Sequence, residues 1–163
     1  MIQEICVIDD NGADLIVDIR KAFMKKQEKI KLTLKNTKQL EDVLDMIPNL
    51  IIINEDKLEI NIYDMVKQIR NDDNNSITPI IVVSSNSSKR HAIDVMKEMV
   101  QYYIRRPFES EYVYYLIKNF LELLQVNRRI SPLTGLPRKC TNTSRNKKEN
   151  IKKRKISECY IWI

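Results

Sequence analysis

The sequence predicts an α/β protein in which five strands form one parallel sheet and helices cover both of its faces. Short apolar runs of strand length alternate along the chain with longer segments that repeat apolar residues at helical spacing. The runs at 50–53 and 80–83 contain only Leu, Ile and Val, which is typical of central strands buried on both sides. Strands that alternate with helices in this way pair in parallel, so the order of the elements predicts the sheet.

The expected strands differ in how much of their surface is apolar. The second strand alternates Ile and Leu with Lys and Thr, which is typical of a sheet edge with one wetter face. An edge position for the second strand and a central one for the third favour the order 2-1-3-4-5 of flavodoxin-like sheets. In chain order, the strands are expected at residues 4–8, 30–34, 50–53, 79–83 and 102–104.

The expected helices carry apolar residues at helical spacing, most weakly in the fourth. Asn36 or Thr37 can cap the second helix, and Pro48 ends it. That helix is expected to turn Leu40, Val43, Leu44 and Ile47 toward the core. The other four helices are expected at residues 14–26, 60–69, 88–96 and 109–126.

Composition indicates one domain with an appendage. The chain has 163 residues, of which 43% are hydrophobic. No apolar stretch approaches the roughly 20 residues that cross a bilayer, and the first residues lack the features of a signal peptide, so a cytoplasmic location is expected. The net charge of +6 is uneven, because residues 138–163 carry nine Lys and Arg against two Glu. That segment has a net charge of +7, which leaves −1 for the rest of the chain.

The cysteines and the single histidine offer little chemistry. The three cysteines show no C-x-x-C spacing, so neither a disulfide framework nor a zinc site is expected. Cys6 lies in the middle of the first strand and is expected to be a small core residue. His91 has no second histidine or nearby cysteine beside it, so we expect a residue on the helix surface rather than a ligand or a catalytic base.

Polar side chains follow four of the expected strands, and the carboxyl ends of parallel strands form the functional crevice of such sheets. Two carboxylates at one strand end require donors or a cation, and a magnesium site would neutralise them economically. Alternatively, one carboxylate of the pair caps the first helix and the other faces water. The residues at these strand ends are Asp9 and Asp10, Asn54, Ser84 and Arg106.

These strand ends resemble those of a response-regulator receiver domain, and the resemblance covers residues 2–126. The pair Asp9-Asp10 matches the acidic pair of the family. Residues 48–54 stand where the family has a strand ending in the phosphoacceptor Asp, and residues 78–84 stand where it has a strand ending in Ser or Thr. The resemblance implies a receiver fold and a non-enzymatic role in bacterial two-component, phosphorelay signal transduction.

The fifth strand carries the remaining part of the resemblance. Tyr103 stands where the family has an aromatic switch residue, and Arg106 precedes Pro107 where the family has Lys before Pro. By this resemblance, Ser84, Tyr103 and Arg106 are expected to be the switch and anion-contact residues.

The sequence departs from the family at the position that matters most. Asn54 replaces the phosphoacceptor, and an amide forms no stable acyl phosphate. A Mg²⁺ site made by Asp9, Asp10 and Asn54 is expected to be weak or lost, because hard cations depend on carboxylates. Arg106 replaces Lys and is expected to pair with Asp9 or Asp10, which would hold one conformation without a signal. The segment 55–62 also lacks the Pro and Gly that are usual there, and Met99 stands where Gly is common.

One alternative is a receiver that is phosphorylated on another carboxylate. Asp56 is the nearest candidate, because on a continuing strand it would face the same side as Asn54, about 6.5 Å further along. That distance is expected to carry Asp56 out of the crevice.

The surface formed by the fourth helix, fifth strand and fifth helix is the expected interface for a homodimer or a protein partner. Exposed tyrosines are enriched in interfaces. Tyr103, Tyr112, Tyr114 and Tyr115 cluster in this part of the sequence. Some of these four are expected to be core residues, and Tyr112 and Tyr115 are the expected contacts.

Residues 127–137 are expected to form a linker, and 138–163 a basic, disordered tail. Residues 131–137 resemble the opening of a diguanylate cyclase (GGDEF) domain, but no GGDEF motif follows, so no cyclase activity is expected. One interpretation is a chain truncated by a frameshift, with an unselected tail. The other is a basic arm for nucleic acid or acidic lipid, and nucleic-acid binding would then depend on 138–163 alone.

Overall fold

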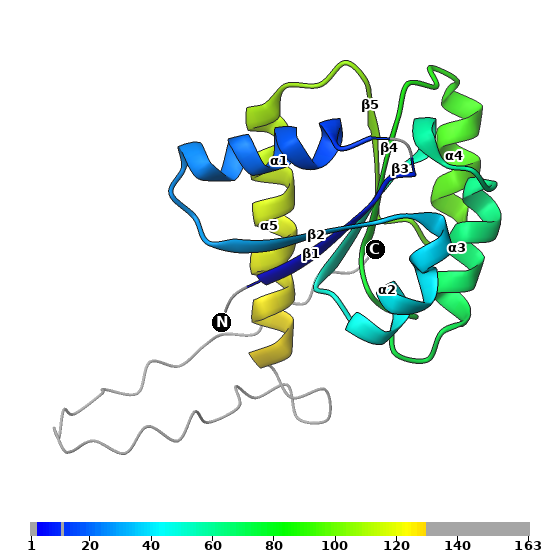
Figure 1. Cartoon of the computed structure of the whole chain (residues 1–163), viewed down its shortest axis with the longest axis horizontal. Coiled ribbons are helices and arrows are strands. Elements are labelled where there is room, and N and C mark those ends of the chain that lie inside the picture. Colours follow the sequence, from blue (N-terminus) through cyan, green and yellow to red (C-terminus); the bar gives the residue numbers. More distant parts are fainter. Residues whose placement is uncertain (1–2, 11, 130–163) are drawn as a thin grey trace, which may run out of the picture. The chain divides into compact units, whose positions relative to one another are not determined.

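The protein is described by a computed structural model that covers residues 3–10 and 12–129. Its centre is one five-stranded sheet in which every pairing is parallel (Figure 1). The strand order β2-β1-β3-β4-β5 confirms the predicted flavodoxin-like order. The strands are β1 (Gln3–Ile8), β2 (Ile30–Lys35), β3 (Leu50–Asn54), β4 (Ile80–Ser84) and β5 (Tyr102–Arg105).

Helices cover both faces of the sheet, as predicted. Helices α1 and α5 lie on one face, and α2, α3 and α4 lie on the other (Figure 1). The helices are α1 (Asp14–Lys25), α2 (Leu40–Met46), α3 (Ile62–Asn71), α4 (Lys89–Lys97) and α5 (Ser110–Arg129), with the short 3-10 helices η1 (Thr37–Gln39) and η2 (Glu55–Lys57).

The predicted end of the domain at residue 126 falls inside α5, which continues to Arg129. The rest of the expected linker and the expected tail, residues 130–163, lie outside the described residues. Within the described ranges, no helix is both long enough and apolar enough to cross a membrane.

Alternation along the strands builds two cores. Leu50 and Ile52 of β3 pack toward α1 and α5, whereas Ile51 and Ile53 pack toward α2, α3 and α4. All five residues of β3 and all five of β4 are buried, which explains why both strands are apolar up to their last residues, Asn54 and Ser84. The edge strand β2 has no fully buried residue. Cys6 is buried in the second of these cores, as expected.

Capping confirms part of the helix prediction and corrects another part. The Asn36 side chain forms a capping box with Gln39, so Asn36 rather than Thr37 caps this segment, but it caps the 3-10 helix η1 that leads into α2, and α2 itself has no side-chain cap. Ile47 was expected to face the core, but it is 51% exposed. The chain leaves α2 there with a left-handed φ of 48°, which turns the side chain outward. Met99 has a φ of 64°, a left-handed conformation that Gly adopts more readily than other residues.

Candidate functional site

Parallel register brings the carboxyl ends of β1, β3 and β4 together. Ile8 pairs with Ile53, and Asn54 pairs with Val83, so the residues that follow these strands meet at one edge of the sheet. A hollow of about 290 Å³ opens there. It is lined by Asp9, Gly12, Asp14, Asn54, Asp56, Lys57, Ser85 and Arg106. We refer to this hollow as the crevice.

Asn54 is buried at the base of the crevice and uses both ends of its amide. Its Nδ2 donates to Oδ2 of Asp9 at 2.8 Å. Its Oδ1 accepts from Nη2 of Arg106 at 3.3 Å. The uncharged amide of Asn54 therefore connects the buried carboxylate of Asp9 to the guanidinium group of Arg106. A carboxylate could not donate to Asp9, so this arrangement depends on the amide.

Asp10 is directed at backbone amides rather than at Asp9. One of its carboxylate oxygens accepts from the N–H of Thr37 at 2.5 Å, and the other accepts from the N–H of Glu59 at 2.6 Å. These bonds fasten the end of β1 to the start of η1 and to the loop before α3. The Asp10 carboxylate therefore holds two loops in place by hydrogen bonds to their backbone. Neither sequence interpretation of the acidic pair included this role.

The Mg²⁺ site implied by the resemblance can be compared with this geometry. Both oxygens of Asp10 accept backbone hydrogen bonds, and the Asn54 amide presents its nitrogen to Asp9 and its oxygen to Arg106. Among the residues that the structure describes, no three His, Cys, Asp or Glu side chains are grouped closely enough to hold a metal ion. In this arrangement Asp10 and Asn54 direct their side-chain oxygens at hydrogen-bond donors rather than at a shared ion, and the weak or lost Mg²⁺ site stays a prediction.

Asp56 lies in the crevice, so the prediction that it would leave the crevice is wrong. Strand β3 ends at Asn54, and the 3-10 helix η2 turns the chain back instead of extending it. Oδ1 of Asp56 accepts from the N–H of Ser85 at 2.7 Å and from Oγ of Ser84 at 3.2 Å. Oδ2 accepts from Oγ of Ser85 at 2.7 Å and lies 3.2 Å from Nε of Arg106.

The ion pair of Arg106 was expected with Asp9 or Asp10, and the structure forms it with Asp56. Burial disfavours the charged form of Asp56, but hydrogen bonds from Ser85 and Ser84 and the charge of Arg106 outweigh it and lower the pKa of this carboxyl. The crevice therefore holds a stable carboxylate, supplied by the chain itself, among donors that suit an anion.

A second polar cluster adjoins the crevice and joins four elements. Glu55 of η2 contacts Nε2 of His91 through Oε1 at 2.6 Å and accepts from the hydroxyl of Tyr103 through Oε2 at 3.1 Å. Nδ1 of His91 lies 3.3 Å from the hydroxyl of Tyr63. Burial, followed by the neighbouring charge of Glu55, raises the pKa of Tyr103 to about 12. We name these four residues the Glu55 cluster.

Sequence reasoning missed the Glu55 cluster. His91 was expected on the helix surface, but its side chain is only 21% exposed and is held by Glu55. The two residues are 36 positions apart, and no motif links them. The only available signal was that Glu55 adjoins Asn54 at the end of a central strand.

The two expected interface tyrosines lie on different sides of α5. Tyr112 is 46% exposed, and its hydroxyl lies 2.6 Å from that of Tyr102 on β5, as expected for the predicted surface. Tyr115 is equally exposed, but Nζ of Lys26, just after α1, lies 5.3 Å from its ring centroid. Its placement on the α4–β5–α5 face is therefore corrected. Tyr114 is buried against Phe23 in the core.

Comparison with known proteins places the fold. No protein-family model and no curated protein matches the sequence. A chemotaxis response regulator of Vibrio cholerae, CheY4, matches the structure with a TM-score of 0.64 at 12% identity, over 74% of this chain and 99% of that one. A signal receiver domain from Clostridium thermocellum matches with a TM-score of 0.64 at 17% identity, over 75% and 99%. A response regulator from Desulfuromonas acetoxidans matches with a TM-score of 0.63 at 17% identity, over 75% and 98%. At these identities, the likeness shows that the chain has the receiver fold.

Proposed function

We propose that this chain is a non-enzymatic signalling module of the two-component type that works without phosphorylation at residue 54. The fold is that of receiver domains, and its solved neighbours are described as response regulators and receiver domains. The amide of Asn54 is buried, with both ends hydrogen-bonded, and it offers no nucleophilic oxygen to a phosphodonor.

The carboxylate of Asp56 carries this proposal. It accepts from Ser84 and Ser85 and pairs with Arg106, so the chain supplies its own anion to the crevice. The ends of β4 and β5 are thereby tied to the turn after β3. A domain held in this way keeps one conformation without an external signal, so its output depends on when and where it meets its partner.

The output surface in this proposal is the α4–β5–α5 face. A hollow of about 470 Å³ lies along β5 and the start of α5, beside the exposed ring of Tyr112. Phe108 and Tyr102 also line it, and aromatic residues are typical of interface cores. We propose that a protein partner or a second copy docks on this face, in the cytoplasm.

A second candidate function follows from the position of Asp56. A carboxylate beside Ser84 and Arg106 is placed where a phosphorylated receiver could carry its acceptor. Against this candidate, the same contacts direct donors at both of its oxygens. An incoming phosphodonor would have to displace hydrogen bonds that lower the pKa of Asp56.

The experiment that tests the proposal is incubation with a radiolabelled acyl phosphate and Mg²⁺, followed by intact-mass measurement. The wild type is expected to gain no phosphoryl group, whereas Asn54→Asp supplies the missing acceptor and is the positive arm. Stoichiometric, base-labile labelling of the wild type would overturn the proposal. Loss of such a label in Asp56→Asn would establish the second candidate.

Two further expectations remain proposals. Nucleic-acid binding through 138–163 involves residues outside the described ranges, and deletion of that segment is its test. The resemblance of residues 131–137 to the start of a GGDEF domain also involves residues outside those ranges.

A further inference from the structure

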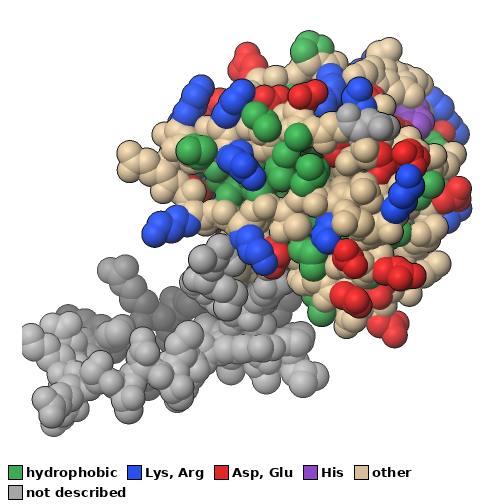
Figure 2. All heavy atoms as spheres, in the orientation of Figure 1, with side chains coloured by type: hydrophobic (Ala, Val, Ile, Leu, Met, Phe, Trp, Pro, Cys, Tyr) green, Lys and Arg blue, Asp and Glu red, His purple; other side chains and the backbone are tan. Residues whose placement is uncertain are grey.

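The folded domain carries its charge in two separate places. Residues 20–31 contain six Lys and Arg against one Glu, a net charge of +5. Two other segments, α2 and the loop after α3, contain five acidic residues and no basic residue. The acidic residues are Glu41, Asp42, Asp45, Asp72 and Asp73. In Figure 2, basic side chains gather at the left edge, over α1 and the loop after it, and acidic side chains gather at the lower right. The near-neutral total of the domain conceals this separation.

The basic segment presents a face built around one apolar side chain. Met24 is 70% exposed near the end of α1. Arg20, Lys21 and Lys25 stand within one helical turn of it, all exposed. None of these three cations forms an ion pair with an acidic side chain in the part of the chain that the structure describes. We name Arg20, Lys21, Met24 and Lys25 the basic face.

The acidic segments border a hollow of the described domain. This hollow, of about 650 Å³, lies between α2 and α3. Leu40 and Leu44 give it an apolar wall, and Glu41 and Asp72 contribute carboxylates. Lys38 also lines it, but its Nζ is paired with Glu59 at 3.4 Å. The full lining is Thr37, Lys38, Leu40, Glu41, Leu44, Gln68, Asn71 and Asp72, and we name it the acidic hollow.

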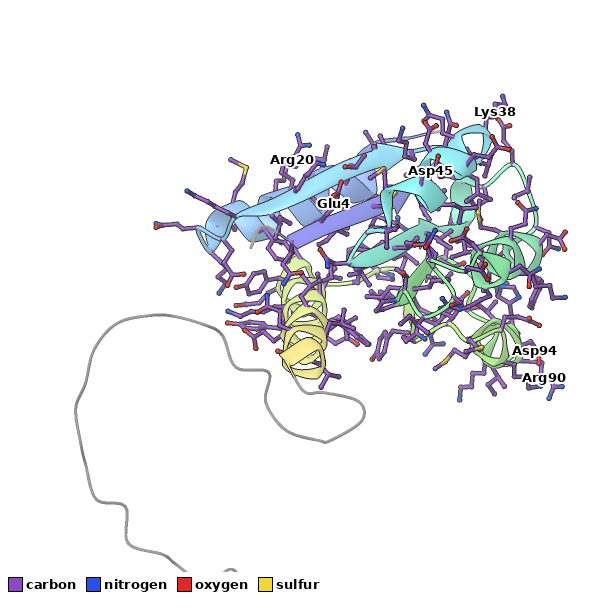
Figure 3. The ribbon with its side chains drawn as sticks, turned by 90° about the horizontal axis from the view of Figure 1, so that it is seen from below. Glu4, Arg20, Lys38, Asp45, Arg90 and Asp94 are labelled. Carbon is purple, nitrogen blue, oxygen red and sulfur yellow. The ribbon has the colours of Figure 1, made fainter. Side chains whose placement is uncertain are left out.

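We propose that the basic face of one copy docks into the acidic hollow of a second copy. Met24 enters the hollow against Leu40 and Leu44, and the cations around it meet the carboxylates at the rim. In Figure 3, Arg20 and Asp45 lie on separate parts of the domain, so the two surfaces of one copy do not meet each other. The groups that select the partner are therefore present on the chain itself. They are the complementary charges of the two surfaces, which surround the exposed Met24 side chain and the apolar wall of the acidic hollow.

This contact is heterologous, because it joins two different surfaces. Each added copy leaves one basic face and one acidic hollow free, so the assembly grows as an open chain rather than closing as a dimer. Exposed ion pairs are individually weak and are screened by salt, so the association is expected to be reversible and strongest at low ionic strength. The inference does not depend on phosphorylation or on the α4–β5–α5 face.

Sedimentation velocity of the full chain over a concentration series tests the proposal. At low salt, the mean sedimentation coefficient is expected to rise steadily with concentration, and the rise is expected to disappear near roughly 0.5 M salt, where charges are screened within a few ångströms. A wild type that stays monomeric at low salt and high concentration would overturn the proposal.

Charge reversal identifies the surfaces. Lys21→Glu/Lys25→Glu and Glu41→Lys/Asp45→Lys are each expected to stay monomeric alone, and an equimolar mixture of the two is expected to associate. Both pairs are exposed helix positions one turn apart, and circular dichroism confirms that each variant is folded. Rescue on mixing cannot come from unfolded protein.

Lys89→Glu on α4 is the matched control and is expected to associate like the wild type. If Lys89→Glu alone abolishes association, the α4–β5–α5 face is responsible. If Lys21→Glu/Lys25→Glu still associates alone, another basic segment is responsible. Either result contradicts the proposal without affecting the phosphorylation test.

Discussion

Nε of Arg106 lies 3.2 Å from Oδ2 of Asp56, and this ion pair joins the residue after β5 to the turn after β3. The same carboxylate accepts from Ser84 and Ser85 at the end of β4. One side chain thus ties three strand ends together. A carboxylate in this position is both a structural element and the occupant of an anion site.

Substitution of Asp56 by Asn should destabilise the domain. The variant keeps the shape of the side chain but removes the charge that Arg106 and Ser85 share. We expect the free energy of unfolding at pH 7 to fall by about 1–3 kcal/mol, because hydrogen bonds to a charged group contribute more than those to a neutral amide. Urea denaturation measures this change. Asp73→Asn is the control, because Asp73 is exposed and its carboxylate has no hydrogen bond or ion pair within the described ranges.

Acid should remove the contribution of Asp56. The pKa of this carboxyl is lowered in the folded state, so the folded protein binds its proton less readily than the unfolded chain does. Its stabilisation is therefore complete above the ordinary pKa of about 4 and is lost as the pH falls through the lowered value. The difference in stability between wild type and Asp56→Asn should shrink below pH 4. A difference that stays constant to pH 2 would show that the charge is not the cause.

Substitution of Asn54 by Asp should make stability depend on Mg²⁺. Without metal, a carboxylate at 54 loses the hydrogen bond to Asp9 and adds a third negative charge beside Asp9 and Asp56, so unfolding should become easier by about 1–3 kcal/mol. Mg²⁺ should reverse this loss in the variant and have a smaller effect on the wild type. Thermal unfolding with Mg²⁺, or with Na⁺ at equal ionic strength, measures both effects. An equal response of the two proteins would show that the amide is not what weakens the site.

The sheet could be predicted from sequence because burial on both faces leaves no choice of residue. Leu50 to Ile53 are apolar at every position since helices cover both of their sides. The same logic placed Asn54 and Ser84 at strand ends, where the apolar runs stop. Their convergence then followed from parallel pairing alone.

The position of Asp56 could not be predicted in this way. An extended chain would have carried it away from the crevice, whereas the 3-10 turn at η2 brings it back beside Ser85. No Pro or Gly between 55 and 62 marks that turn in the sequence. The prediction that Ile47 faces the core was wrong for a related reason. Helical spacing cannot show where a residue with left-handed backbone angles ends the helix.

The thiol of Cys6 should report global unfolding. Burial raises its pKa to about 12, so the reactive thiolate is scarce in the folded state even at alkaline pH. In a background of Cys140→Ser/Cys159→Ser, alkylation at pH 9 should follow the rate of unfolding rather than the concentration of reagent. Mass spectrometry after timed quenching gives that rate. Alkylation that is fast in native buffer and proportional to reagent would indicate local opening of β1.

The contact between Glu55 and His91 should be energetically coupled. Oε1 and Nε2 are 2.6 Å apart, and both side chains are mostly shielded from water, so removing either one leaves its partner without its main contact. In a double-mutant cycle of Glu55→Gln and His91→Ala at pH 7, we expect a coupling energy of about 0.5–3 kcal/mol.

Tyr103→Phe serves as the comparison in this cycle, because it removes only the hydroxyl that donates to the other oxygen of Glu55. Its coupling with His91→Ala should be smaller, since the two groups share Glu55 but are not hydrogen-bonded to each other. Coupling near zero for Glu55 and His91 would show that α4 is held by its apolar contacts alone. A large coupling would show that α4 is fastened to the turn beside Asn54, so that a partner bound on α4 could sense the crevice without any phosphate.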